Sequence, residues 1–280
     1  MKWRGREGSS NIEDRRSTRS GGVIAGGGLG VLALLAIGYF LGVDVSPLVE
    51  EASLPGQAPS ELTEADREAG EFVSVVLGDT EKIWSGIFEQ QLGRTYTPTT
   101  LVLYKGVTPS ACGGASGATG PFYCPGDKQI YLDTDFFVTL GQRLGAGGDF
   151  AAAYVVAHEV AHHVQDELGI LSEANNTRAQ VGEAESNAIS VRIELQADCY
   201  SGIWARYAEE RFGTLEPGDV EEAMNAAKQI GDDMLQRNAG RVPMPHTFTH
   251  GTSEQRQRWF ATGYQTAELA ACDTFGTDRL

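Results

Sequence analysis

The segment His158-Glu159-Val160-Ala161-His162 constrains this chain more than any other feature. It lies inside an apolar run, Ala151 to Gln165, that predicts a helix. Residues four apart on a helix share one face, so His158 and His162 can offer two imidazole nitrogens to a single ion. Glu159 lies about 100° further round the helix, where it can accept a proton from a water at the metal. We therefore predict a zinc hydrolase, with a metallopeptidase as the first candidate. The alternative is a helix with two histidines that bind nothing.

A second predicted helix, residues 187–200, carries the acidic groups that such a site still needs. A catalytic zinc takes three protein ligands and leaves one position open. Glu194 is our candidate for the third ligand, and Asp198 can accept the other N–H of a ligating histidine and fix its tautomer. Two acids on one face of an apolar helix are costly to bury unless a metal and an imidazole compensate them. The alternatives are a solvated acidic face, or Glu183 and Glu185 as ligands.

Three stretches of sequence carry a resemblance to a known family. They are His158-Glu159-Val160-Ala161-His162-His163-Val164-Gln165, Glu194-Leu195-Gln196-Ala197-Asp198-Cys199-Tyr200 and Thr249-His250-Gly251-Thr252-Ser253-Glu254-Gln255-Arg256. Together they resemble the bacterial "putative neutral zinc metallopeptidase" family over nearly the whole chain. The acid pair is also similar to the E-x-x-x-D arrangement of gluzincin-type peptidases. The resemblance implies Zn²⁺ as cofactor, Glu194 as the third ligand and Asp198 as the residue that supports a ligand.

A hydrolase also needs a donor for the oxyanion of its tetrahedral intermediate. His250 is our candidate, because the resemblance places it in a loop-to-helix motif and the following Gly251 allows close approach. Arg256 is the second choice. We assign no role to His246, which stands where the family pattern has no histidine. His163 points about 100° away from the neighbouring ligand and is predicted to be structural.

The N-terminal part of the chain predicts a membrane anchor. Residues 1–20 hold six basic and three acidic side chains, whereas residues 21–43 hold no charged side chain. A helix needs about 20 apolar residues to span a bilayer, and basic flanks stay in the cytoplasm. We predict a cytoplasmic basic segment (1–20), a transmembrane anchor in the lipid bilayer (21–43), a linker (44–67) and an extracytoplasmic zinc metallopeptidase-like domain (68–280). A cleaved signal peptide is the alternative, but its apolar core would span only about 7–15 residues.

Net charge and cysteine content give information about binding partners and about disulfide bonds. The formal net charge is −16 over 280 residues, and this argues against nucleic acid as a partner because a phosphate backbone requires a basic face. Four cysteines follow the predicted span, and an even number outside the cytoplasm favours disulfides. Three pairings are possible. Cys112 and Cys124 bracket one loop and hairpin, so we pair them, which leaves Cys199 with Cys272. The alternative for Cys199 is a thiolate ligand to zinc.

The predicted elements give a helix-dominated α+β fold of zincin-like type with a small β-sheet. Besides the two helices above, we expect helices at 70–92, with an interruption at Gly78-Asp79, at 220–237 and from Ser253 onward. We expect a strand at Leu101–Tyr104 and a hairpin at 122–132, preceded by a Gly/Ala/Ser loop at 113–120. The edge of this sheet is where an extended peptide could add as a further strand.

These observations predict a membrane-anchored zinc metallopeptidase that hydrolyses peptide bonds in a peptide or protein substrate with a metal-activated water. The main alternative is a membrane-tethered zinc-binding pseudopeptidase, or partner-binding module, without turnover. A structural ectodomain without metal is also compatible with the sequence, and so is an amidase acting on envelope material.

Overall fold

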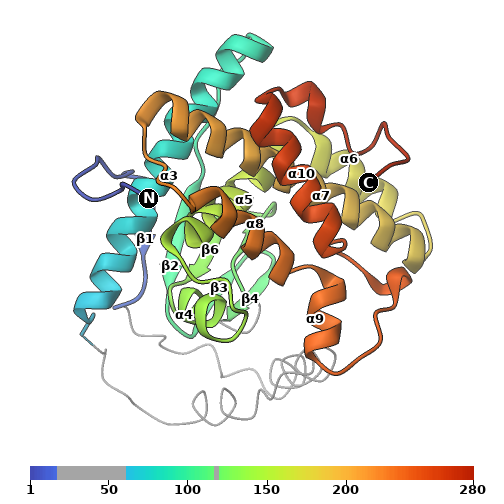
Figure 1. The fold of residues 1–280 in the computed structure, drawn as a ribbon, viewed down its shortest axis with the longest axis horizontal. Coiled ribbons are helices and arrows are strands. Elements are labelled where there is room, and N and C mark those ends of the chain that lie inside the picture. Colours follow the sequence, from blue (N-terminus) through green and yellow to red (C-terminus); the bar gives the residue numbers. More distant parts are fainter. Residues whose placement is uncertain (18–60, 117–119) are drawn as a thin grey trace.

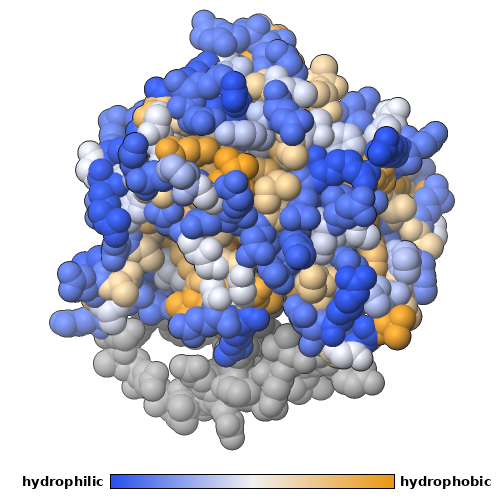
Figure 2. Space-filling model, in the orientation of Figure 1, coloured by the Kyte–Doolittle hydropathy of each residue, from blue (hydrophilic) through white to orange (hydrophobic). Residues whose placement is uncertain are grey.

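The computed structural model describes residues 1–17, 61–116 and 120–280, and every structural statement concerns these residues. Helices outweigh two small sheets, which confirms the helix-dominated α+β class (Figure 1). The predicted transmembrane anchor and most of the predicted linker lie outside the described residues. Among the described helices, none is both long enough and apolar enough to cross a membrane. The face seen in Figure 2 is mostly hydrophilic, with apolar side chains in small separate patches, as expected for an acid-rich chain.

The elements have the following bounds. The strands are β1 (Ile12–Asp14), β2 (Thr100–Tyr104), β3 (Val107–Ser110), β4 (Gly113–Ser116), β5 (Phe122–Cys124) and β6 (Gln129–Asp133). The α-helices are α3 (Glu64–Ile87), α4 (Asp135–Gln142), α5 (Asp149–Glu167), α6 (Ile170–Arg178), α7 (Glu183–Phe212), α8 (Asp219–Gln229), α9 (Asp232–Asn238) and α10 (Ser253–Thr266). Shorter helical turns are η1 (Phe88–Leu92), η2 (Pro245–Thr247) and η3 (Leu269–Cys272).

The main sheet has the strand order β1-β2-β6-β5. β1, β2 and β6 are parallel, whereas β5 is antiparallel to β6 with Tyr123 opposite Ile130. The predicted strand and hairpin are therefore confirmed. The predicted loop at 113–120 is partly wrong, because Gly113–Ser116 pairs antiparallel with β3. Backbone hydrogen bonds make this pairing whatever the side chains are, and Gly and Ala give almost no strand signal in sequence.

Residues 1–16 belong to the same folded body as residues 61–116 and 120–280. β1 pairs with β2, so that Ile12 lies opposite Leu101. Trp3 is 4% exposed and packs edge-to-face on Phe72 of α3, with 5.4 Å between ring centroids. Arg16 is buried and donates a hydrogen bond to the backbone carbonyl of Asp66. The sequence predicts residues 1–20 to be a separate segment, whereas in the structure Ile12–Asp14 form an edge strand of the main sheet, and Met1, Trp3 and Arg16 are buried against the domain.

The N-terminal segment also explains a wrong prediction in α3. We expected an interruption at Gly78-Asp79, but α3 runs unbroken from Glu64 to Ile87. A side chain at Gly78 would bring its Cβ to 3.1 Å from the backbone nitrogen of Ser9, so glycine allows the segment to lie close against the helix. Asp79 is buried there and accepts a hydrogen bond from Arg6. Both residues therefore serve packing rather than a break in the helix.

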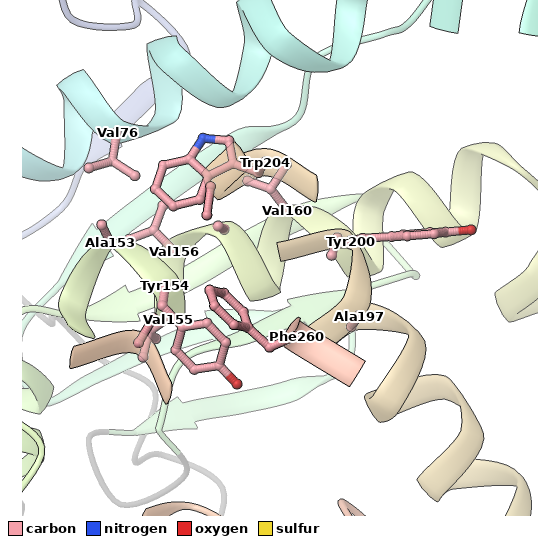
Figure 3. Packing of buried hydrophobic residues seen from close by; sticks show 14 of the residues in the cluster. Val76, Ala153, Tyr154, Val155, Val156, Val160, Ala197, Tyr200, Trp204 and Phe260 are labelled. Atoms are coloured by element: carbon pink, nitrogen blue, oxygen red, sulfur yellow. The ribbon is translucent and has the colours of Figure 1, made fainter. Parts of the chain in front are cut away.

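Helix α5, which carries the H-E-x-x-H motif, is the central element of the core. Its residues 150–161 are all buried, as expected for a helix that is apolar on every side. Figure 3 shows side chains of the neighbouring helices gathered around it, with Trp204 of α7 and Phe260 of α10 among them. The predicted helix at 151–165 is confirmed and extends by two residues at each end. Gly169, at φ +80°, adopts the left-handed conformation between the end of α5 and the start of α6.

Helices α7 and α10 approach each other closely through two glycines (Figure 1). A Cβ at Gly202 would lie 2.0 Å from the carbonyl oxygen of Phe260, and a Cβ at Gly263 would lie 1.8 Å from that of Cys199. Only residues without a side chain fit at these two positions. This contact brings the first turn of α10 against α7 and so positions Arg256 beside Asp198.

One further prediction is wrong, and the two predicted disulfides are confirmed. The helix expected at 220–237 is two helices, α8 and α9, because Gly231 is extended and Ser253 packs directly against it. Both predicted disulfides are present, Cys112–Cys124 and Cys199–Cys272. The second one ties η3 to α7.

Candidate metal centre and active site

The structure brings His158, His162 and Glu194 together from α5 and α7. Their donor atoms all lie within 4.8 Å of one another. His158 Nε2 is 3.1 Å from Glu194 Oε2, and His162 Nε2 is 3.5 Å from Glu194 Oε1. Zinc bonds of about 2.0–2.1 Å in a tetrahedron put ligand atoms about 3.3 Å apart. The three predicted ligands therefore fit a zinc ion, and each histidine presents its Nε2 to the site.

His158 is supported by a charged network. Its Nδ1 lies 3.0 Å from Asp198 Oδ1, and Asp198 is fully buried. Arg256 donates to both oxygens of Asp198, from Nε at 2.8 Å and from Nη2 at 2.9 Å, and the hydroxyl of Tyr154 donates to the same carboxylate. Burial alone would lower the pKa of His158, but the hydrogen bonds and negative charges of Asp198 and Glu194 outweigh it and raise that pKa to about 10. Asp198 thus lies beside His158 Nδ1, at the position that the helical spacing predicts.

Arg256 has a different position from the one predicted as second choice for the oxyanion donor. It is 2% exposed, and its guanidinium also donates to the carbonyl oxygen of Ile230 at 3.3 Å. A side chain that is buried and bonded in this way neutralises Asp198 and does not face a substrate. The correction follows from the close packing of α7 and α10, which the sequence did not reveal.

His162 is supported by a neutral amide instead. Its Nδ1 is 2.9 Å from Gln165 Oε1, and Gln165 in turn donates to Gln196 at 3.0 Å. Sequence reasoning missed both glutamines, and it also missed Tyr154 beside His158. Helical spacing was an available signal, since Gln165 follows His162 by three residues and Tyr154 precedes His158 by four.

Glu159 lies at the same site but is not part of the donor set. It is 7% exposed, and burial raises the pKa of its carboxyl. A backbone hydrogen bond from Tyr123, on the outer strand β5, partly offsets this effect of burial on the pKa. The second oxygen, Oε2, is buried without a hydrogen-bond partner among the residues that the structure describes. A buried carboxylate oxygen of this kind needs a partner that the protein itself does not provide, such as a water or a substrate.

His250 is held by Asp232, a residue that sequence reasoning missed. One oxygen of Asp232 accepts from the backbone N–H groups of Thr249, His250 and Gly251, and the other lies 3.1 Å from His250 Nδ1. The side chain of His250 is half-exposed. Its partial desolvation lowers its pKa, but the hydrogen bond to Asp232 and the charge of Glu194 outweigh this effect and raise that pKa. The contact with the Asp232 oxygen requires a proton on Nδ1, and Nε2 becomes a donor when the ring carries its second proton. No local pattern pointed to Asp232, because it precedes His250 by 18 residues.

The remaining candidates lie outside the donor set. His163 is buried, with Nε2 2.7 Å from the carbonyl oxygen of Thr97 and Nδ1 3.2 Å from the Tyr123 hydroxyl, as a structural histidine would be. His246 is exposed. Glu183 and Glu185 are exposed in the first turn of α7. Cys199 is disulfide-bonded, which removes the thiolate alternative.

This arrangement belongs to a known class of metal site, in which an H-E-x-x-H helix supplies two histidines and a second helix supplies a glutamate. The comparison of sequences agrees. The chain belongs to the family described as "Putative neutral zinc metallopeptidase", whose profile matches residues 1–275.

Two relatives illustrate the extent of the similarity. "Uncharacterized protein YpfJ" of Escherichia coli (strain K12) is 43% identical over 287 residues, which cover 99% of each chain. "Uncharacterized protein Rv2575" of Mycobacterium tuberculosis (strain ATCC 25618 / H37Rv) is 47% identical over 190 residues, which cover 64% of this chain and 63% of that one. No solved structure matches this chain.

Proposed function

We propose that this protein is a zinc-dependent metallopeptidase. One observation carries the proposal: Glu159, a buried carboxylate with an oxygen left unpaired by the described residues, lies beside a triad of donor atoms suited to zinc. A histidine–histidine–glutamate set without a neighbouring base would suit a structural metal equally well. The added base indicates hydrolysis.

The roles follow from the positions of the side chains. His158, His162 and Glu194 would hold the zinc ion, which activates a water and polarises a scissile carbonyl when bound. Glu159 accepts the proton of the attacking water and passes it to the leaving amine. Burial raises the pKa of this carboxyl and so makes it a stronger base. His250, oriented by Asp232, donates a hydrogen bond to the developing oxyanion.

The sheet supports a peptide as the class of substrate. β5 lies at one end of the main sheet and pairs with β6 on one side only within that sheet. The backbone of its residue Tyr123 reaches Glu159, so this strand borders the base. An extended peptide that pairs with such a strand gains main-chain hydrogen bonds and lies next to the attacking water. We propose that substrates bind along β5 in this way.

The experiment that tests the activity is Glu159→Gln, assayed for zinc content and for cleavage of a mixed fluorogenic peptide pool. The variant should retain one zinc per chain, because Glu159 is not a ligand, and should lose about 10²–10⁴-fold in kcat/KM, as expected for loss of a general base. The matched control is Glu173→Gln, an exposed carboxylate on α6. Full activity in Glu159→Gln would refute the mechanism. Bound zinc with no turnover in the wild type would favour the pseudopeptidase.

Membrane anchoring is a separate part of the proposal, and it rests on residues 21–43 alone. A single crossing with the N-terminus in the cytoplasm would place residues 1–16 and 61–280 on opposite sides of the bilayer. The contacts of β1 and Trp3 would then be absent from the inserted protein. Protease protection of membrane vesicles, with one epitope at each end of the chain, decides the matter. Protection of one epitope only indicates a single span, and equal accessibility of both refutes it.

A further inference from the structure

We propose that Gln165 and Gln196 are positioning residues that fix the tautomer and orientation of His162, with the Cys199–Cys272 disulfide as their anchor. The proposal rests on the zinc site proposed above and adds residues to it that neither the motif nor the family description specifies. It concerns the affinity of the site for its metal, which can be measured without any turnover.

The contacts form one continuous chain. His162 Nδ1 lies 2.9 Å from Gln165 Oε1. Gln165 Nε2 donates to the carbonyl oxygen of Ile193 at 2.8 Å and to Gln196 Oε1 at 3.0 Å. Gln196 Nε2 then donates to the carbonyl oxygen of Cys272 at 3.0 Å. Gln165 is 0% exposed and Gln196 is 4% exposed, so water does not compete for these bonds.

The direction of every bond in this chain is determined by its two carbonyl groups. A backbone carbonyl can only accept, so the Ile193 and Cys272 oxygens must each face an amide NH₂. The Oε1 of Gln165 is then left for His162, which has to donate from Nδ1. If either amide were turned round, two acceptors would face each other in a buried site, which costs about 1–3 kcal/mol. His162 is therefore held as the Nδ1–H tautomer, with the Nε2 lone pair free for a metal.

There is an electrostatic reason for a neutral amide, rather than a carboxylate, beside His162 Nδ1. The site already holds the buried carboxylates of Glu159 and Asp198 and the largely buried carboxylate of Glu194, and of these three Arg256 pairs only with Asp198. A second supporting carboxylate behind His162 would add an uncompensated negative charge to the interior. An amide oxygen orients the imidazole without that charge.

The disulfide fixes the far end of the chain of amides. Cys199 follows Gln196 on α7 by three residues, and its bond to Cys272 holds η3 against that helix. The carbonyl that accepts from Gln196 belongs to Cys272 itself. The disulfide thereby fixes the carbonyl group that holds Gln196, and Gln196 and Gln165 in turn hold His162.

The test compares Gln165→Met and Gln196→Met with Gln91→Met. Gln91 is the matched control, because it also bonds two backbone groups, the Ala267 carbonyl and the Leu269 N–H, but has no contact with the site. Zinc Kd is measured on folded protein by competition with a chromophoric chelator. Gln165→Met should weaken zinc binding by about 10–100-fold, as is typical when a residue that supports a ligand is lost. Gln196→Met should weaken it less, and Gln91→Met should leave it unchanged.

A second measurement separates positioning from general destabilisation. The ¹⁵N shifts of the His162 imidazole in zinc-free protein should show the Nδ1–H tautomer in the wild type and in Gln91→Met, and a mixture in Gln165→Met. Removal of Cys199 and Cys272 together should weaken zinc binding, whereas removal of Cys112 and Cys124 together should not. Unchanged Kd and tautomer in both glutamine variants would overturn the proposal, even if the protein proved to be an active peptidase. Weakened zinc binding in the variants would support it even if no peptide were cleaved.

Discussion

The two histidines of the metal centre are supported in opposite ways. Behind His158 lies a fully buried ion pair, Asp198 with Arg256, to which Tyr154 adds a hydroxyl. Behind His162 lie two neutral amides that end on backbone carbonyls. Both arrangements leave Nε2 facing the same point. The protein thus orients one imidazole ring with charged side chains and the other with neutral ones.

The two kinds of support are expected to contribute differently to the stability of the fold and to metal binding. A buried charge pair binds its partners strongly, but each member becomes costly when the other is removed. Each hydrogen bond between neutral amides contributes less free energy. Leaving one of their buried donors or acceptors unpaired also costs less, about 1–3 kcal/mol. We therefore expect the His158 side to dominate the stability of the fold, and the His162 side to affect the metal more than the fold. Substitutions on the His158 side test this division.

The largest effect is expected for Arg256→Met. This change leaves the carboxylate of Asp198 buried and without its cation, so the free energy of unfolding should fall by about 3–5 kcal/mol. The measurement is denaturant unfolding of the zinc-free protein. Arg258→Met is the control two residues along the same helix, where the ion pair with the exposed Glu254 contributes less than about 1 kcal/mol. Equal losses in the two variants would contradict the assigned role of the buried pair.

A smaller effect is expected for Tyr154→Phe. The variant loses the hydrogen bond that the hydroxyl donates to Asp198 and the longer one that it accepts from Arg256, while it keeps the ring that packs on Phe260. The loss of stability should be about 2 kcal/mol. Tyr264→Phe removes a hydroxyl from the carboxylate of Glu209 at the surface and serves as the control. If Tyr154→Phe were as stable as the control, the charged network would consist of Asp198 and Arg256 alone.

The sequence predicted those parts of the site that depend on spacing along one helix. The donor set and Asp198 all follow from i, i+4 relations within α5 and α7, and the structure brings these residues together as expected. Gln165 stands at a comparable spacing but was missed, because a glutamine on a helix is usually a solvated side chain and nothing local shows that this one is buried.

The remaining parts depend on contacts between distant segments. Asp232 meets His250 only through the packing of α9 against the loop before α10, and Arg256 meets Asp198 only because Gly202 and Gly263 let two helices touch. β1 pairs with a strand that lies far along the chain. Three residues of strand with one apolar side chain carry no sequence signal of such a partner.

The pairing of β1 with β2 also has a consequence for the order of events during synthesis. Ile12 leaves the ribosome early, but its partner Leu101 is made only after residues 21–43 are complete. At 5–20 residues per second, the interval between residue 43 and residue 101 lasts about 3 to 12 seconds. Any interaction that requires only the first 43 residues can therefore form several seconds before β1 can pair with β2. β1 therefore pairs with β2 only in those chains whose first residues are still free when β2 emerges from the ribosome.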